Sequence, residues 1–255
     1  MKVIAVANRK GGVGKTTTAI NIATAMAAIG KKVLVLDLDP QGNATTSMGV
    51  DKRKCEYSSY DVLINNTDPE LAIKSCEIPD FYILPSKPEL AGAEIELIDI
   101  EKREFVLRRA LMNITGKYDY VLIDCPPSLN LITINALVAA NSVIIPLQCE
   151  FLALEGLTDL IKNINQIKKV FNPGLKVQGI ILTMYDRRNN LSSMVEKDVR
   201  QYFGELVYQT VIPRSVRISE APSHGKPILI YDFKSVGAQA YINLAKEVLK
   251  REKEI

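Results

Sequence analysis

The chain has 255 residues, which fits one large α/β domain or two small ones, and 47% of them are hydrophobic, which is ample for a buried core. Its formal net charge of +3 is too small by itself to indicate a nucleic-acid partner, so any basic surface must be a local patch. A single histidine and four cysteines without Cys-x-x-Cys spacing give little support to thiolate metal sites or a Ser-His-Asp triad, and the absence of a signal peptide or membrane-length apolar run predicts a cytoplasmic protein.

The first predicted unit is a strand, a glycine-rich loop and a helix. Val3–Ala7 is an apolar run, and after the loop a helical period continues to about Ile29. Glycines let a backbone wrap closely around an anion, and the start of a helix adds positive potential. We therefore predict a nucleoside-triphosphate site. Its predicted members are Lys10, Gly11, Gly12, Val13, Gly14, Lys15, Thr16 and Thr17.

Two lysines distinguish this loop. Lys15 is expected to reach the outer phosphates, and the hydroxyl of Thr16 is expected to ligate Mg²⁺. The general pattern G-x-x-x-x-G-K-[ST] needs a glycine where this chain has Arg9, and Lys10 follows at the loop entrance. Lys10 could be a solvated loop residue. Alternatively it supplies charge to a phosphate, and because the loop start points away from its own γ-phosphate, that phosphate would belong to a facing subunit.

A second buried strand, Lys32–Asp37, is followed by Leu-Asp39-Pro-Gln-Gly-Asn43. Strand, helix and strand in this order form a right-handed βαβ unit with the phosphates at the carboxyl edge of the strands. The carboxylates that follow the strand should therefore face the nucleotide. Asp39, beside a proline, is the better candidate to approach water and Mg²⁺, whereas Asp37 could be merely structural.

The middle of the chain is less informative until a third strong strand. We predict a short helix at Tyr60–Ile64, a strand at Phe81–Leu84 and one helix over 88–115. The apolar strand Tyr118–Asp124 then ends in an acid, and an aspartate at this place beside a phosphate-binding loop holds the magnesium, directly or through water. We assign this Walker B role to Asp124; the alternative role of helix cap would fall more naturally to Ser128.

The remaining pattern predicts strands at Ser142–Leu147, Val177–Met184 and Val207–Ile212, with helices at 154–170 and about 235–250. No repeat or linker is visible. We therefore expect a single α/β domain over 1–255, a P-loop NTPase with a mostly parallel twisted sheet and helices on both faces.

The loops after the last two strands should lie at the ligand edge. We expect three residues in them to lie on the adenine side of the site: Met184, Pro213 and Ser215.

Four segments together resemble the ParA/Soj chromosome-partitioning ATPases, a branch of the ParA/MinD deviant Walker A superfamily. They are Lys10–Thr17, Asp37–Asn43, Asp124–Ser128 and Ser219–Lys226. The chain begins at the strand before the phosphate-binding loop, so it is similar to the short chromosomal type.

This resemblance implies an ATPase that forms a homodimer with ATP and Mg²⁺ sandwiched between subunits, binds DNA without sequence preference on the nucleoid, and is released when a ParB-type partner stimulates hydrolysis. Lys10 of the facing subunit and Lys15 would neutralise charge, and Asp39 would orient the attacking water. Thr16, Asp39 and Asp124 would form the metal environment.

The DNA-binding expectation needs basic residues that meet phosphates rather than a base-reading helix. Arg187-Arg188 and Arg217 follow strands near the nucleotide edge, and the resemblance points to Arg188 and Arg217. Twofold symmetry would double such a patch. The weaker candidates are Lys226, Lys246, Lys250 and Arg251.

Three other classes of protein with this type of phosphate-binding loop are alternatives. A MinD-like membrane-cycling ATPase needs a C-terminal amphipathic helix rich in large apolar residues, and residues 249–255 are too charged. A redox ATPase like the nitrogenase iron protein needs cysteines that hold a cluster across a dimer, and Cys125 and Cys149 lack the matching contexts. A dethiobiotin-synthetase-like enzyme needs a substrate pocket, which no motif here identifies.

Overall fold

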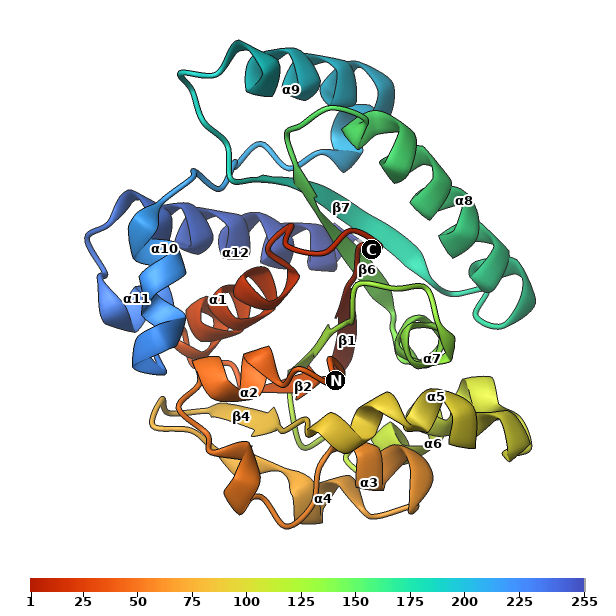
Figure 1. The fold of residues 1–255 in the computed structure, drawn as a ribbon. Coiled ribbons are helices and arrows are strands. Elements are labelled where there is room, and N and C mark those ends of the chain that lie inside the picture. Colours follow the sequence, from red (N-terminus) through yellow and green to blue (C-terminus); the bar gives the residue numbers. More distant parts are fainter. Residues whose placement is uncertain (255) are drawn as a thin grey trace.

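The computed structural model describes residues 1–254 and contains a seven-stranded sheet in the order β3-β4-β2-β5-β1-β6-β7. Every neighbouring pair is parallel except β3 with β4. This confirms the predicted mostly parallel α/β class (Figure 1). The strands are β1 Lys2–Val6, β2 Val33–Asp37, β3 Lys74–Ser75, β4 Phe81–Leu84, β5 Tyr120–Asp124, β6 Ser142–Gln148 and β7 Lys176–Thr183.

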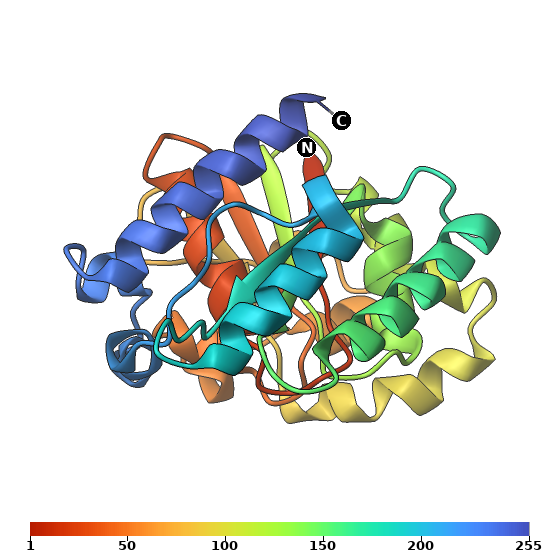
Figure 2. The ribbon, with the colours of Figure 1, turned by 90° about the horizontal axis from the view of Figure 1, so that it is seen from above.

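Helices cover both faces of the sheet, because its central strands are apolar on both sides. Alternate residues of β2 illustrate this: Val33 and Val35 pack into one hydrophobic cluster, and Leu34 and Leu36 pack into the other. The first face is covered mainly by α1 (Lys15–Ala27) and α12 (Val236–Glu254). The opposite face is covered by α3 (Ser59–Ile64), α6 (Val106–Met112), α7 (Leu131–Ala139) and α8 (Ala153–Val170) (Figures 1 and 2).

The strand register brings the ends of β1, β2 and β5 into line. Val6 pairs with Asp124, and Asp124 pairs with Asp37. Both predicted site strands therefore end level with the strand that enters the glycine-rich loop. At the amino end of β1, Lys2 forms an ion pair with Glu252, near the end of α12. The two ends of the chain therefore lie close together (Figure 2).

The single helix predicted over 88–115 is wrong. The segment is divided into several short helices, and Lys102 interrupts it with a left-handed backbone (φ 54°). The apolar residues do not keep one helical phase: Leu97 is buried, but Ile95 is 73% exposed. The pieces are 3₁₀ helix Pro88–Ala91, α5 Ala93–Glu96, 3₁₀ helices Leu97–Asp99 and Arg103–Phe105, and α6.

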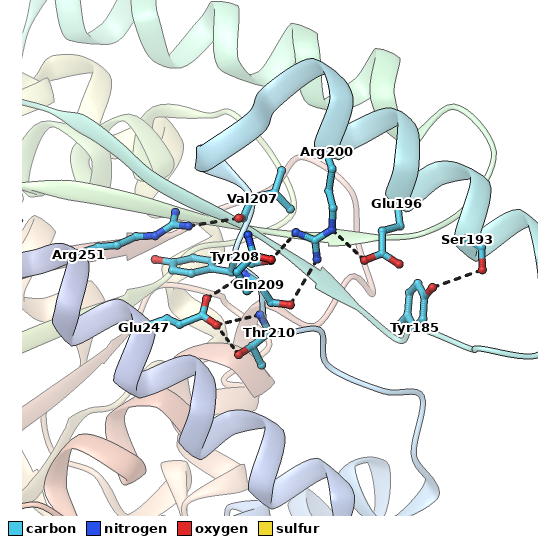
Figure 3. A network of polar contacts seen from close by, with 10 residues as sticks. All are labelled: Tyr185, Ser193, Glu196, Arg200, Val207, Tyr208, Gln209, Thr210, Glu247 and Arg251. Carbon is cyan, nitrogen blue, oxygen red and sulfur yellow. Dashed lines mark hydrogen bonds and ion pairs between the residues drawn. The ribbon is translucent and has the colours of Figure 1, made fainter.

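The strand predicted at Val207–Ile212 is also wrong. The segment lies beside β7, and the amides of Tyr208 and Ile212 donate to carbonyls of that strand. It nevertheless forms only an isolated bridge, between Val207 and Ile180, and a second bridge, between Pro213 and Tyr185, lies just beyond it. Side chains of α9 (Asn190–Phe203) and α12 bind the backbone groups that a neighbouring strand would have paired (Figure 3). Arg200 donates to the carbonyls of Tyr208 and Gln209, and Glu247 accepts from the amides of Gln209 and Thr210.

Several short elements were not predicted from the pattern. They are β3, α2 Asn43–Ser47, α4 Pro69–Ala72, α10 Val216–Glu220, α11 Ile228–Tyr231, and 3₁₀ helices Lys52–Lys54, Gly204–Leu206 and Ala221–His224. The longer helices α7 and α9 were not predicted either. All four cysteines are free thiols. Within residues 1–254, no helix combines the length and apolar character needed to cross a membrane.

Candidate nucleotide site

The glycine-rich loop connects β1 to α1, and two of its glycines have positive φ angles. Gly12 and Gly14 have φ angles of 74° and 88°, which residues with side chains rarely adopt. The hydroxyl of Thr183, at the end of β7, donates to the carbonyl of Val13 at 2.8 Å and so ties the loop to the sheet. No side chain caps the start of α1. Its first amides are therefore available to an anion such as a phosphate.

Lys15 lies across this loop rather than in solvent. It is 6% exposed, and its ammonium donates to the carbonyl of Lys10 at 3.0 Å. Burial lowers the pKa of Lys15, while the carboxylates of Asp124 and Asp39 and the Cys125 thiol raise it. A partly desolvated cation of this kind interacts strongly with a phosphate that replaces the missing solvent.

Lys10 occupies the loop entrance and has an acidic partner. Its ammonium forms an ion pair with Glu150, in the segment that follows β6, and its side chain remains about half exposed. Glu150 was not predicted from the sequence, where its only local signal is that it is the first acid after that strand. The two lysines of the loop therefore have different environments: Lys15 is buried at the sheet edge, and Lys10 is at the surface.

Asp124 is the most unusual carboxylate of the site. It is fully buried, and among the described residues neither of its oxygens has a hydrogen-bond partner. Burial, together with the nearby Asp37, raises its pKa well above the ordinary value, while the Thr16 hydroxyl opposes the shift. An orphaned carboxylate beside a hydroxyl fits the oxygen donors that Mg²⁺ prefers. The cap expected at Ser128 is wrong, because Asn130 accepts from the Thr133 amide and caps α7.

The two aspartates after β2 have different surroundings. Asp37 accepts from the amide and hydroxyl of Thr45, at 2.8 and 2.7 Å, and thereby anchors α2. Burial nevertheless raises its pKa to about 6. Asp39 is half-buried, and one of its oxygens accepts from the Gln41 amide at 2.9 Å. This agrees with a structural Asp37 and places Asp39 at the surface of the site.

Within residues 1–254, no group of three acidic, histidine or cysteine side chains is arranged to hold a metal by itself. Mg²⁺ at phosphoryl-transfer sites is commonly bound by one or two protein oxygens together with the substrate phosphates. In such a site, the protein oxygens would come from Thr16, Asp39 and Asp124.

The three predicted adenine-side residues lie on two adjoining segments. Met184 follows β7 with φ 49°, and Tyr185 bridges to Pro213. Pro213 and Ser215 line a hollow of about 880 Å³ that Arg188 also lines.

The two predicted DNA-binding arginines are exposed and paired with acids. Arg188 binds Asp186 through two hydrogen bonds of 3.0 Å, and Arg217 pairs with Glu220 and Asp232. By contrast, Arg251 is structural. Its guanidinium donates to the carbonyls of Gln178, Leu206 and Val207 and lies over the ring of Tyr208.

Residues 1–177 match a family model described as an AAA domain. The chain is 53% identical to the chromosome partitioning protein ParA of Caulobacter vibrioides, over all of this chain and 96% of the relative. It is 51% identical to the sporulation initiation inhibitor protein Soj of Bacillus subtilis, over 97% of this chain and 98% of the relative.

A solved structure titled cobyrinic acid a,c-diamide synthase, from Mycobacterium smegmatis with bound ADP and magnesium, superposes with a TM-score of 0.87. It is 40% identical, and the match covers 99% of this chain and 96% of that one. The septum site-determining protein MinD of Pyrococcus horikoshii, complexed with Mg-ADP, has a TM-score of 0.82 at 29% identity, with 97% and 95% of the chains covered. The chain has the glycine-rich loop and the buried Asp124, and it is about half identical to two partitioning proteins over nearly their full length. It therefore belongs to the ParA/Soj family of chromosome-partitioning ATPases.

Proposed function

We propose that this protein is an ATP-driven partitioning switch. Two copies enclose two ATP molecules with Mg²⁺, the dimer binds duplex DNA without sequence preference, and a ParB-type partner stimulates hydrolysis and releases it. The observation that carries the proposal is the pair of lysines. Lys15 is buried at the start of α1, where it would meet the phosphates of its own nucleotide, whereas Lys10 is half exposed at the loop entrance, where it would face a second subunit.

In this proposal, different residues of the site have different roles in phosphoryl transfer. The loop amides and Lys15 bind the phosphates, and Lys10 adds charge to the nucleotide of the facing subunit. Thr16 and Asp124 would hold Mg²⁺, which when bound would supply charge neutralisation for the phosphoryl transfer. Asp39 lies at the surface of the site and orients the attacking water. Adenine lies against Met184, Pro213 and Ser215.

DNA binding would follow from the loops near this edge. Arg188 and Arg217 are exposed arginines whose charges meet backbone phosphates, and the twofold axis of the dimer doubles their number. Each must exchange its present acid partner for a phosphate. Because exposed ion pairs contribute little stability, this exchange costs little.

The hydrolysis rate tests the proposal. The protein alone should turn over slowly, because in this proposal full activity needs both Lys10 of a second subunit and the ParB-type partner. Duplex DNA together with the ParB-type protein of the same genome should raise the rate about tenfold or more. Asp39→Ala should still bind ATP but lose the stimulated rate. Fast hydrolysis by the protein alone, independent of its concentration, would contradict the proposal.

A further inference from the structure

A hollow of about 420 Å³ lies beside the entrance of the glycine-rich loop. One side is formed by Asn8, Arg9 and Lys10 of the loop, and the other by the segment after β6 and the start of α8. Lys10 and Glu150, which form an ion pair, both line it. The hollow is therefore continuous with the surface from which Lys10 would reach another subunit.

Two large apolar side chains stand exposed at the rim of this hollow. Phe151 is 77% exposed and Leu152 is 59% exposed. Leu152 also has a left-handed backbone, with φ 64° and ψ 13°, directly before α8. Leucine rarely adopts this conformation, and such outliers concentrate at functional contacts. The chain thus places an aromatic residue in solvent directly before a residue with a strained backbone.

The charges around the hollow are mixed in sign. Arg9 and Lys10 are basic, and Glu150 and Asp159 are acidic. A patch that carries both signs can complement a copy of itself across a twofold axis, where each contact occurs twice. A purely basic surface would instead repel its copy. This mixture favours a second copy of the chain over a nucleic acid as the occupant.

We propose that in the ATP-bound dimer Phe151 of each subunit enters this hollow of the other. The inference rests on the proposed function, because it assigns a contact within that dimer. The hollow has room for the ring, since a cavity of about 150 Å³ already admits benzene. Docked there, the ring excludes water beside Lys10, at the point where this lysine must leave its own subunit. Aromatic anchors in central pockets commonly dominate an interface.

Sedimentation velocity with a non-hydrolysable ATP analogue tests this contact. Phe151→Ala should raise the dimer dissociation constant about tenfold or more, because two rings are lost per dimer. Binding of a fluorescent ATP analogue to the dilute monomer should be unchanged. The matched control is Phe233→Ala, which removes a similarly exposed ring (60%) in the turn between α11 and α12 and should dimerise like the parent protein.

The outcomes separate the inference from the function on which it rests. If the parent protein dimerises with the analogue and Phe151→Ala dimerises equally well, the contact is wrong while the switch survives. If the parent protein forms no dimer, the proposed function fails and this contact fails with it. Because Phe151 is exposed, its replacement should leave thermal unfolding unchanged, which a melting curve verifies.

Discussion

The carboxylate of Asp124 is fully buried beside Asp37, and within residues 1–254 no group forms a hydrogen bond of good geometry with it, although the Thr16 hydroxyl lies nearby. In the nucleotide-free protein such a group is expected to reduce stability, because burial disfavours its charged form. Its folded-state pKa is raised, so the folded chain retains a proton that the unfolded chain releases. The free energy of unfolding therefore falls as the pH rises from the ordinary value of an aspartate through this raised pKa. Functional sites often combine activity with such a local loss of stability.

Asp124→Asn should thus raise the melting temperature of the nucleotide-free protein at pH 8. A gain of about 1 kcal/mol would appear as roughly 2–4 °C in a chain of this size. The gain should shrink at pH 5, where the parent carboxyl is more protonated. Magnesium-dependent ATP binding should be weakened in the same variant. A lower melting temperature at pH 8 would contradict this interpretation of the buried carboxylate.

Gly12 provides a second test at the residue scale. A Cβ at this position would have no atom within 4 Å in the monomer, so space within the chain is not what requires glycine. Its φ of 74° makes a β-branched residue strained there. Gly12→Val should retain measurable ATP binding but lose ATP-dependent dimerisation, because the side chain occupies the space into which the facing loop must approach. Normal dimerisation of this variant by size-exclusion chromatography would refute the close approach of two loops.

Local spacing located the glycine-rich loop and the acids that follow two strands, because each of these positions depends on neighbours in the sequence. Glu150 and Thr183 escaped prediction for the opposite reason. Thr183 contacts the loop from 170 positions away, and no local pattern records that contact. The segment 207–212 shows the same limit at the scale of an element. Its apolar residues resemble a strand, but Arg200 and Glu247 bind its backbone in place of a neighbouring strand.

Glu247→Ala should destabilise this segment. It removes an acceptor of the Gln209 and Thr210 amides and of the Thr210 hydroxyl (Figure 3). Hydrogen bonds to charged groups contribute about 1.5–3 kcal/mol each but are not additive, so we expect a loss of about 2 kcal/mol, or roughly 4–8 °C in melting temperature. The neighbouring Lys246→Ala, at an exposed position of the same helix, is the control and should change little. Equal melting temperatures for both variants would exclude the anchoring role.

Two arginines in loops at the nucleotide edge are predicted to bind DNA. Arg188→Ala combined with Arg217→Ala should abolish retention on duplex DNA while ATP binding remains, because the lost charges meet phosphates only in the complex. Arg53→Ala is a matched control. Arg53 pairs with Asp51 through two hydrogen bonds, as Arg188 pairs with Asp186, and it is likewise exposed. Unchanged retention by the double variant, or equal loss with Arg53→Ala, would argue against these loops.

At the scale of the whole molecule, apolar strands alternating with helical segments were enough to predict a mostly parallel sheet. Such sheets are covered on both faces, and their sites lie at the carboxyl edge. The order of the strands was not predictable, because it depends on contacts between distant segments. The homodimer was expected from the family resemblance alone. In the proposed dimer, the half-exposed Lys10 and the solvent-exposed Phe151 would both contact the second copy.

The most direct test of this account is retention on non-specific duplex DNA with no nucleotide, with ADP and with ATP, at low and moderate salt. We predict retention only with ATP, weakening steeply as salt increases, and lost in Gly12→Val although that variant binds ATP. Retention that is independent of nucleotide, or no retention in any state, would contradict an ATP-driven DNA-binding dimer.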